Sequence, residues 1–374
     1  MADKLDLIPV SAWDIFPETR PLVIAGPCAA ENESQVLETA RGIAAAGIRV
    51  FRSGIWKPRT HPGCFEGAGE RGLPWLLEAR KQYGLKVCTE VARPAHVEAC
   101  LRHGVDMVWI GARTTANPFQ VQELADALAG SDIPVLVKNP VSPDLDLWIG
   151  ALERLNRAGI RKLGVVHRGF SSFQAMPYRN DPGWRIPIEL RTIYPRLPFF
   201  ADPSHMGGDR KFLRELSQRS LDLGADGLMI ESHCNPACSL SDAQQQLTPE
   251  DLRILLTEKL IVRNTDPHEL DNTAAIRVLR ERIDRVDGDI LSLLKARMTL
   301  SREIGNFKRE RNIAILQTAR WDGLMEDVIR KGKEGGLEEH FLRTLFNVIH
   351  EESIRVQNDI LAGASSEDDN IVTE

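Results

Sequence analysis

The segment Arg52-Ser53-Gly54-Ile55-Trp56-Lys57-Pro58-Arg59-Thr60 follows a short apolar run, 48–51, and places three cations within eight residues. Proline continues neither a strand interior nor a helix, so this segment is predicted to be a shaped loop. The same arrangement, a charged or metal-binding type of residue just past an apolar run, recurs as far as Glu231. Enzymes built on parallel strands carry their chemistry at such strand ends.

Short apolar segments alternate with amphipathic segments of helix length. The predicted strands are 22–27, 48–52, 86–91, 107–111, 135–138, 163–167, 199–202 and 227–231. The predicted helices are 34–46, 73–83, 94–103, 119–128, 145–158, 186–194, 211–223 and 249–259. Glycines stand where five of these helices should end, at 47, 84, 104, 159 and 224. The repeat predicts an α/β fold, a (β/α)8 TIM barrel. A doubly wound open sheet is the alternative, but no glycine-rich phosphate fingerprint follows the first strand.

Length and composition narrow the class of protein. A chain of 374 residues is too long for most single cores and predicts two domains. A net charge of −6 argues against nucleic-acid binding. The chain has no apolar run of membrane-spanning length and no signal-peptide core, so we expect a cytoplasmic protein that binds no membrane. We divide it into a barrel at 1–260, a linker at 261–270, an all-helical domain at 271–363 and a disordered acidic tail at 364–374.

The residues at the predicted strand ends form two chemical groups. Six of them are cations: Arg52, Lys57, Arg59, Arg113, Lys138 and Arg168. Unpaired cations gathered at one barrel mouth would repel one another, so phosphate and carboxylate groups are the expected ligands. Cys28, His205, Glu231 and Asp242 offer sulfur, nitrogen and oxygen donors, a mixture that suits a divalent transition metal. Such a metal can act as a Lewis acid on a carbonyl.

Five motifs resemble those of 3-deoxy-D-arabino-heptulosonate 7-phosphate (DAHP) synthase, in its compact type I subgroup related to the octulosonate synthases. They are Gly26-Pro27-Cys28, Lys57-Pro58-Arg59-Thr60, Gly111-Ala112-Arg113, Asp202-Pro203-Ser204-His205, and Ala225-Asp226-Gly227 with Glu231. The resemblance covers roughly residues 20–260. It implies condensation of phosphoenolpyruvate with erythrose 4-phosphate on a (β/α)8 barrel, with one divalent metal ion, for which we consider Mn²⁺, Fe²⁺, Co²⁺ and Zn²⁺.

The same resemblance implies roles for single residues. The metal ligands would be Cys28, His205, Glu231 and Asp242. Phosphoenolpyruvate would be held by Arg113, Lys138 and Arg168. Erythrose 4-phosphate would be held by Arg52, Lys57, Pro58, Arg59 and Thr60. We assign catalytic roles in the barrel to Lys138, Glu90 and His205. Two alternatives stay open: a 3-deoxy-D-manno-octulosonate 8-phosphate synthase, and a Schiff-base aldolase that uses Lys138 as its nucleophile.

After residue 270 the pattern is helical only, with predicted helices at about 273–310, 318–333 and 337–361. The first carries apolar residues at alternating spacings of three and four, the pattern of a coiled-coil seam. Arg297 interrupts this seam, either extending to solvent or reaching an anion inside the bundle, and Lys308 lies on nearly the same face. A helix of ~57 Å is too long for so small a bundle to cover, which predicts a homodimer through these helices.

Residues 271–361 resemble the all-helical chorismate mutase of the AroQ class. The match rests on Leu279–Asp284, Arg297, Gly305–Lys308, Arg320 and Ser353–Gln357. It implies that Arg280, Arg297 and Arg320 hold substrate carboxylates and that Lys308 and Gln357 contact the ether oxygen of chorismate as catalytic residues. Ser353 shares a helix face with Gln357 and belongs to the same set.

Two positions depart from the mutase pattern, because Gln317 and Trp321 stand where acidic residues are expected near the substrate hydroxyl. Asp322 is a candidate replacement. The alternative is a ligand-sensing helical module without turnover. We favour a bifunctional enzyme of aromatic amino acid biosynthesis, through the shikimate pathway, whose barrel is feedback-inhibited by prephenate or chorismate bound to the helical domain.

Overall fold

This computed structural model describes residues 5–58, 63–173, 175–263, 274–316 and 318–362, without the side chains of residues 274–275 and 318–320. The chain forms two compact units, Met1–Thr265 and Asp266–Glu374, and each is described by itself. The finer division at 260, 270 and 363 stays a prediction, because most of the linker and all of the tail lie outside the described residues. Within the described part, no helix is both long and apolar enough to cross a membrane.

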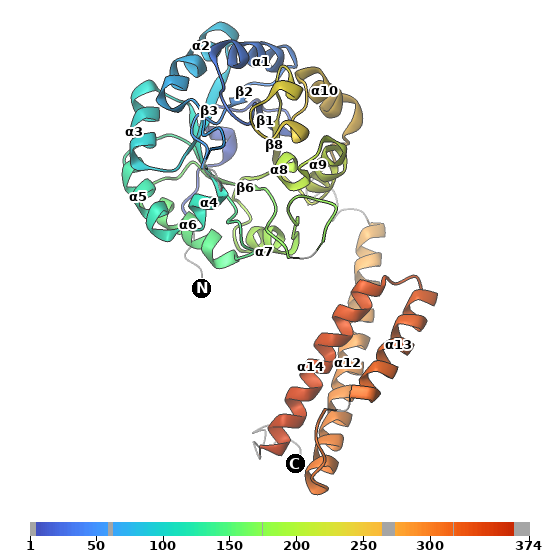
Figure 1. Ribbon diagram of the computed structural model, residues 1–374. Coiled ribbons are helices and arrows are strands. Elements are labelled where there is room, and N and C mark those ends of the chain that lie inside the picture. Colours follow the sequence, from blue (N-terminus) through green and yellow to red (C-terminus); the bar gives the residue numbers. More distant parts are fainter. Residues whose placement is uncertain (1–4, 59–62, 174, 264–273, 317, 363–374) are drawn as a thin grey trace. The chain divides into compact units, whose positions relative to one another are not determined.

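Eight parallel strands form a closed barrel in the order β1 to β8 (Figure 1). They are β1 Leu22–Gly26, β2 Val50–Arg52, β3 Lys86–Val91, β4 Met107–Ile110, β5 Val135–Lys138, β6 Leu163–His167, β7 Phe199–Ala201 and β8 Gly227–Glu231. The barrel closes between β1 and β8, where Gly26 lies opposite Glu231. The predicted (β/α)8 fold is therefore confirmed, and each predicted strand is found within two residues of its expected limits.

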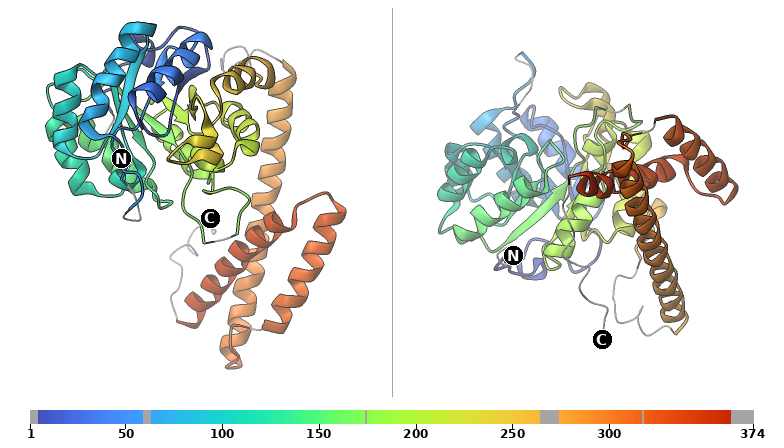
Figure 2. Two further views of the ribbon diagram at one scale, coloured as in Figure 1. Left: turned by 45° about the horizontal axis from the view of Figure 1, so that its top comes forward. Right: turned by 90° about the horizontal axis from the view of Figure 1, so that it is seen from below.

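Helices surround the barrel on its outside (Figures 1 and 2). They are α1 Glu33–Ala45, α2 Leu73–Tyr83, α3 Pro94–His103, α5 Pro118–Leu128, α6 Leu145–Arg157, α7 Arg185–Ile193, α9 Leu213–Asp222 and α10 Pro249–Ile254, while the short helices α4 Ala112–Thr115 and α8 Pro203–Gly207 lie inside this ring (Figure 1). A π-helical turn, Leu255–Lys259, continues α10. All five glycines predicted to end helices adopt positive φ, which favours glycine.

Two of these helices, α4 and α8, are short and were not predicted. They begin directly after β4 and β7 and carry Arg113 and His205 respectively. The Asp202 side chain caps α8 by accepting a hydrogen bond of 3.0 Å from the His205 backbone N–H. These one-turn helices therefore fix the backbone of two predicted site residues at the barrel mouth.

Besides the main apolar core of the barrel unit, a smaller apolar cluster fills the barrel interior. Side chains such as Ile24, Trp109 and Phe200 form it, and Trp13 and Ile15 from the N-terminal segment are buried against it. The segment before β1, predicted only as an irregular lead-in, thus contributes to the core. Burial on both strand faces explains why the strands read as continuous apolar runs instead of alternating patterns.

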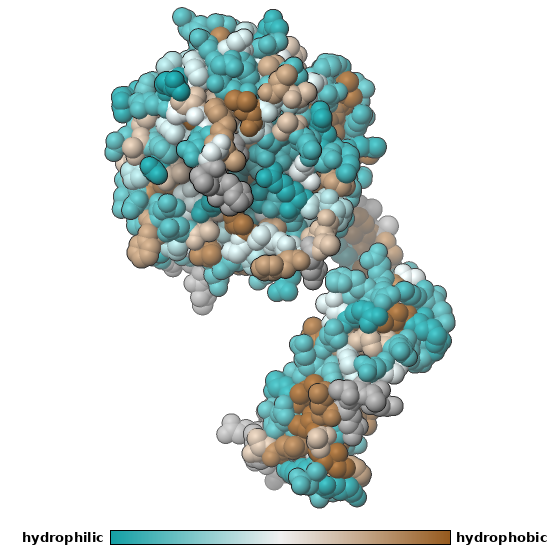
Figure 3. Space-filling view, in the orientation of Figure 1, coloured by the Kyte–Doolittle hydropathy of each residue, from teal (hydrophilic) through white to brown (hydrophobic). Residues whose placement is uncertain are grey.

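The described residues of the second unit form three helices, α12 Ala274–Glu310, α13 Thr318–Glu334 and α14 Glu339–Leu361, close to the predicted ranges. The C-terminal half of α12 packs on α14, where Gly305 lies against the backbone of Gln357. The remaining apolar residues of this unit form brown areas on its surface (Figure 3). Its fold is therefore all-helical, as predicted.

Candidate active sites

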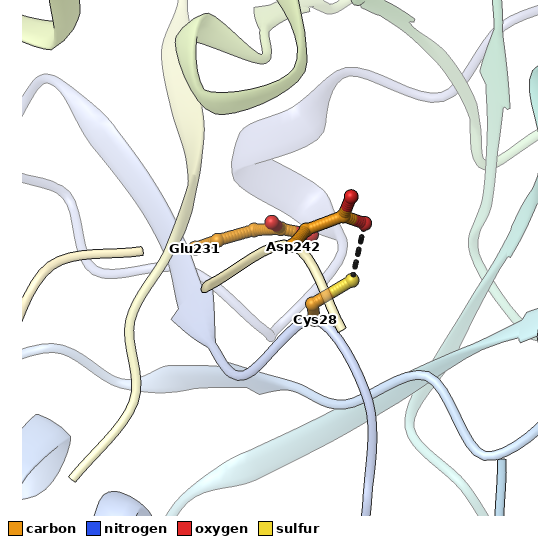
Figure 4. A group of neighbouring side chains, drawn as sticks. All are labelled: Cys28, Glu231 and Asp242. Atoms are coloured by element: carbon orange, nitrogen blue, oxygen red, sulfur yellow. Dashed lines mark hydrogen bonds between the residues drawn. The ribbon is translucent and has the colours of Figure 1, made fainter. Parts of the chain in front are cut away.

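Three of the predicted metal ligands converge where the barrel closes (Figure 4). Cys28 follows β1, Glu231 ends β8, and Asp242 precedes a 3-10 turn, Ala243–Gln245, in the loop beyond β8. Their candidate ligand atoms lie within 4.8 Å of one another, and Cys28 Sγ is 3.1 Å from Asp242 Oδ2. Residues far apart in the sequence are thus brought to one point by the β1–β8 pairing.

His205 lies beside these three ligands with its ring orientation fixed. Its Nδ1 is 2.8 Å from Asp202 Oδ2, and its Nε2 is 3.6 Å from Glu231 Oε1. Burial lowers the pKa of His205, although Asp202 and Glu231 oppose the shift, which favours the neutral ring. A neutral ring that donates through Nδ1 to Asp202 leaves the Nε2 lone pair for a metal, and carboxylates commonly orient metal-binding histidines in this way.

The charges of this cluster fit a divalent transition metal. Burial, followed by the Glu231 carboxylate, raises the pKa of the Cys28 thiol to about 12. Burial also opposes the charge of Glu231, yet His205 and Arg52 hold the pKa of that carboxyl below its usual value. A cation among these donors would offset the carboxylate charge and favour the thiolate, and one sulfur, one imidazole and two carboxylates form a borderline-soft ligand set.

A pocket opens next to the predicted ligands at the barrel mouth. It is lined by Lys57, Pro58, Glu90, Gly111, Ala112, Arg113, Lys138, Val141, Arg168, Arg179, Asn180, His205 and Asp242. Four of the six predicted cations are in this lining. Arg59 lies outside the described residues, as does Thr60. The sequence therefore located the pocket correctly and identified most of its positive charge.

Two of these cations, Arg52 and Lys138, are paired with carboxylates of the barrel itself. Arg52 is fully buried, lies outside the pocket lining, and its Nη2 is 3.1 Å from Glu231 Oε1. Lys138 Nζ is 2.7 Å from Asp202 Oδ2. A buried cation without a counter-charge costs several kcal/mol, so the barrel interior supplies a carboxylate to each. Arg52 is therefore paired with Glu231, one of the predicted metal ligands, and does not line the pocket.

Glu90 explains the glycine in the Gly111-Ala112-Arg113 motif. Its carboxylate accepts a hydrogen bond of 3.3 Å from Trp109 Nε1 and lines the pocket. A Cβ atom at position 111 would lie 2.1 Å from Glu90 Oε1, so any larger residue there would displace the carboxylate. Gly111 thus makes room for an acidic group among the cations.

Arg179 and Asn180, which the sequence analysis did not select, also line the pocket. Arg179 Nη1 donates to Asp242 Oδ1 at 2.8 Å and to Gln245 Oε1 at 3.0 Å. Asn180 accepts from Arg168 Nη1 at 2.7 Å and donates to the His205 carbonyl at 2.6 Å. An isolated bridge between Phe170 and Asp181 turns this segment back to the barrel mouth. The sequence carries no local signal for that return.

In the helical unit, α12 and α14 bring four of the predicted mutase residues together. Arg297 Nη1 donates to Ser353 Oγ and, at 3.3 Å, to the Ile349 carbonyl. Lys308 Nζ donates to Gln357 Oε1 at 3.1 Å, and both side chains are buried. Arg297 therefore turns inward instead of extending to solvent, and the cluster presents two cations and an amide without a base.

Arg280, another predicted mutase arginine, is not part of this cluster in the single chain. Arg280 lies 17 positions before Arg297 on the same straight helix, which separates the two by about 26 Å at 1.5 Å per residue. The side chain of Arg320 lies outside the described residues. Arg280 and Arg297 therefore do not meet within one chain, and a shared role in substrate binding stays a prediction.

A closed (β/α)8 barrel with cations and metal-type ligands at its strand ends defines an enzyme acting on small anionic molecules. The chain belongs to the DAHP synthetase I family, whose sequence pattern matches residues 15–263. The pattern of chorismate mutase type II matches residues 279–358 in the helical unit. The chain is thus a bifunctional enzyme of aromatic amino acid biosynthesis, a DAHP synthase joined to a chorismate mutase.

Known proteins resemble the barrel most clearly. A phospho-2-dehydro-3-deoxyheptonate aldolase of Thermotoga maritima is 33% identical over 236 residues, covering 63% of this chain and 68% of the relative. A 2-dehydro-3-deoxyphosphooctonate aldolase of Nitratidesulfovibrio vulgaris is 29% identical over 253 residues, covering 64% and 90%. The crystal structure of the Thermotoga maritima DAHP synthase has a TM-score of 0.58 and 30% identity, covering 67% and 71%.

Proposed function

We propose that the barrel condenses phosphoenolpyruvate with erythrose 4-phosphate, releasing phosphate, with a divalent metal held by Cys28, His205, Glu231 and Asp242. The observation that carries this proposal is the convergence of these four side chains beside a cation-lined pocket. When bound, the metal supplies Lewis-acid polarisation of the sugar aldehyde oxygen. Mn²⁺, Fe²⁺, Co²⁺ and Zn²⁺ all suit the ligand set.

The cations of the barrel bind the anionic groups of the two substrates, and Glu90 transfers a proton. Arg113, Lys138 and Arg168 bind the carboxylate and phosphate of phosphoenolpyruvate, while Lys57, with Pro58, Arg59 and Thr60, binds the sugar phosphate. Arg52 acts through its ion pair with Glu231 and not by touching substrate. Glu90, the acidic side chain facing these cations, moves a proton during the condensation.

The Schiff-base alternative is disfavoured by the environment of Lys138. Burial lowers its pKa, but Asp202 opposes the shift, and the 2.7 Å ion pair favours the protonated amine. A nucleophilic lysine must be neutral and free to reach a carbonyl carbon, and this ammonium is held by a carboxylate that also orients His205. We therefore assign Lys138 to anion binding.

The sugar specificity separates the proposal from the octulosonate alternative. Purified full-length enzyme should consume phosphoenolpyruvate with erythrose 4-phosphate, and a chelator should abolish the reaction until a divalent metal is restored. Arabinose 5-phosphate should be a poor substrate by the same assay. Faster turnover of the five-carbon sugar would overturn the assignment, and full activity under exhaustive chelation would overturn the metal.

We propose further that the helical unit is a homodimer. The apolar seam of α12 is exposed in the single chain, with side chains from Leu279 to Phe307 between 48% and 70% accessible. Phe341, Leu345 and Val348 form a second exposed stripe on α14. A two-fold related copy would cover both stripes and would bring the partner subunit's Arg280 to the Arg297 cluster. Along one helix the two arginines stay about 26 Å apart, which supports a second copy as the source of this arginine.

Feedback inhibition of the barrel is the last part of the proposal. One chain carries a DAHP synthase and a chorismate mutase, and the link at residues 261–270 keeps the two at high effective concentration. A ligand that binds the mutase site more tightly in an inhibited arrangement shifts the population toward it, typically by about 1–3 kcal/mol of coupling. Prephenate and chorismate are the candidate effectors.

We also propose that the enzyme acts in the cytoplasm, a reducing compartment in which its free cysteines stay reduced.

Prephenate should therefore inhibit DAHP synthesis by the intact enzyme, by about 5- to 150-fold at saturation if the coupling is of this size. Arg297→Ala should retain the uninhibited rate but need far more prephenate for inhibition, because the clamp on the carboxylate is lost. A chain ending at residue 263 should respond to neither ligand. Equal inhibition of the intact enzyme and the Arg297→Ala variant would contradict regulation through the mutase site.

A further inference from the structure

An aromatic pair stands beside the mutase cluster at the position where the sequence departs from the expected pattern. Trp321 of α13 stacks on His350 of α14, with ring centroids 3.9 Å apart and planes inclined by 15°. Asp322, the replacement considered from sequence, is exposed on the helix surface. The structure thus offers an imidazole, and not the neighbouring carboxylate, at this side of the site.

His350 shares a helix face with the predicted substrate residues of α14. It precedes Ser353 by three positions and Gln357 by seven, spacings that place all three along one side of the helix. The carbonyl of Ile349, its neighbour, accepts a hydrogen bond from Arg297. The Trp321 ring packs against the imidazole and restricts its orientation, so His350 is a held side chain at the edge of the cluster.

The surroundings of this imidazole favour its neutral form. Burial lowers the pKa of His350, Arg297 and then Lys308 lower it further, and Glu351 opposes the shift. A neutral imidazole has one N–H donor and one acceptor nitrogen. It is therefore suited to a neutral hydroxyl, which both donates and accepts, and not to a further carboxylate.

Chorismate has two carboxylates, an ether oxygen and one ring hydroxyl. The arginines match the carboxylates, and Lys308 with Gln357 matches the ether oxygen, which leaves the hydroxyl without an assigned partner. We propose that His350, held against Trp321, hydrogen-bonds the ring hydroxyl of chorismate and makes the site selective for it. This inference rests on the proposed mutase site and deepens it.

The test compares chorismate with an analogue in which a hydrogen atom replaces the ring hydroxyl, using full-length His350→Phe and His350→Gln. His350→Phe retains a stacking ring without a hydrogen-bonding group and should lower kcat/KM for chorismate about tenfold, the effect of one lost hydrogen bond. It should change kcat/KM for the analogue without the hydroxyl little, so the preference for chorismate disappears. His350→Gln keeps a donor and an acceptor and should restore most of that preference.

Two controls distinguish the possible failures. His340 is exposed on the same helix, and His340→Gln should behave as the unaltered enzyme. DAHP synthesis by each variant reports that the preparation is folded. If His350→Phe keeps the original preference ratio, or if His350→Gln restores none of it, the role of His350 is overturned. Absence of chorismate rearrangement by the unaltered enzyme would instead overturn the mutase assignment.

Discussion

Replacing Cys28 with alanine is expected to lower DAHP synthesis at least about a hundredfold while leaving chorismate rearrangement unchanged. Loss of residues that merely support metal ligands typically costs 10- to 100-fold, so loss of a ligand should cost no less. A methyl group cannot coordinate a metal, and the remaining Asp242 and Glu231 carboxylates lack the thiolate that favours a borderline metal. Metal content after dialysis and initial rates of phosphoenolpyruvate consumption measure the two effects.

Cys100 provides the matched control for this variant. It is likewise buried, but it lies on α3 in the outer core and burial alone raises the pKa of its thiol to about 12. Cys100→Ala should bind metal and condense substrates like the unaltered enzyme, with at most a modest loss of stability from the small cavity. Chelator-insensitive, full activity of Cys28→Ala would show that the proposed ligand set is wrong.

Arg297→Ala is expected to lower chorismate rearrangement about 10²- to 10³-fold while DAHP synthesis stays near normal. The rearrangement is unimolecular, so its rate depends on holding the compact substrate conformer and on donors placed where negative charge grows. Arg297 is held inward by Ser353 and the Ile349 carbonyl, ready to receive a carboxylate. Arg302, exposed on the same helix, gives the control variant Arg302→Ala, which should retain full mutase activity.

Mixing two inactive variants tests whether the site spans two chains. Arg280→Ala and Arg297→Ala homodimers should each be inactive as mutases. After subunit exchange, half of the dimers are mixed, and one of their two sites has both arginines intact, so about a quarter of the activity should return. No recovery after demonstrated exchange would place Arg280 outside the substrate site of the partner subunit.

The sequence predicted the barrel and much of its pocket because the fold follows directly from strand order. In a parallel barrel every strand end reaches the same mouth, so residues that follow a strand, such as Cys28, Glu231 and Lys138, can be grouped without knowing any contact. The ends of the helices could also be predicted from the sequence, because glycines and capping residues mark them locally. These features depend on short stretches of chain or on a repeated topology.

What the sequence did not reveal depends on tertiary contacts. Arg179 and Asn180 enter the pocket through a long excursion after β6, and the bridge that returns them pairs residues with no distinguishing pattern. The burial of Arg52 with Glu231 could not be separated from substrate binding, because a cation at a strand end has the same appearance in either role. In the helical unit, the sequence predicted one helix that holds both Arg280 and Arg297, but not that the Arg297 side chain would bond to Ser353 and the Ile349 carbonyl of α14.

The closure of the barrel between β1 and β8 has a consequence for how the enzyme is made. Cys28 and Asp242, whose side chains meet at 3.1 Å, are separated by 214 residues in the chain. At about 5–20 residues per second, ~10–40 s pass on the ribosome between the synthesis of the two. During that interval the Cys28 thiol has emerged without its carboxylate partners, and the last strand is missing. The proposed metal site can therefore be completed only after β8 and the loop that carries Asp242 have been made, while the helical unit that follows can still be in synthesis.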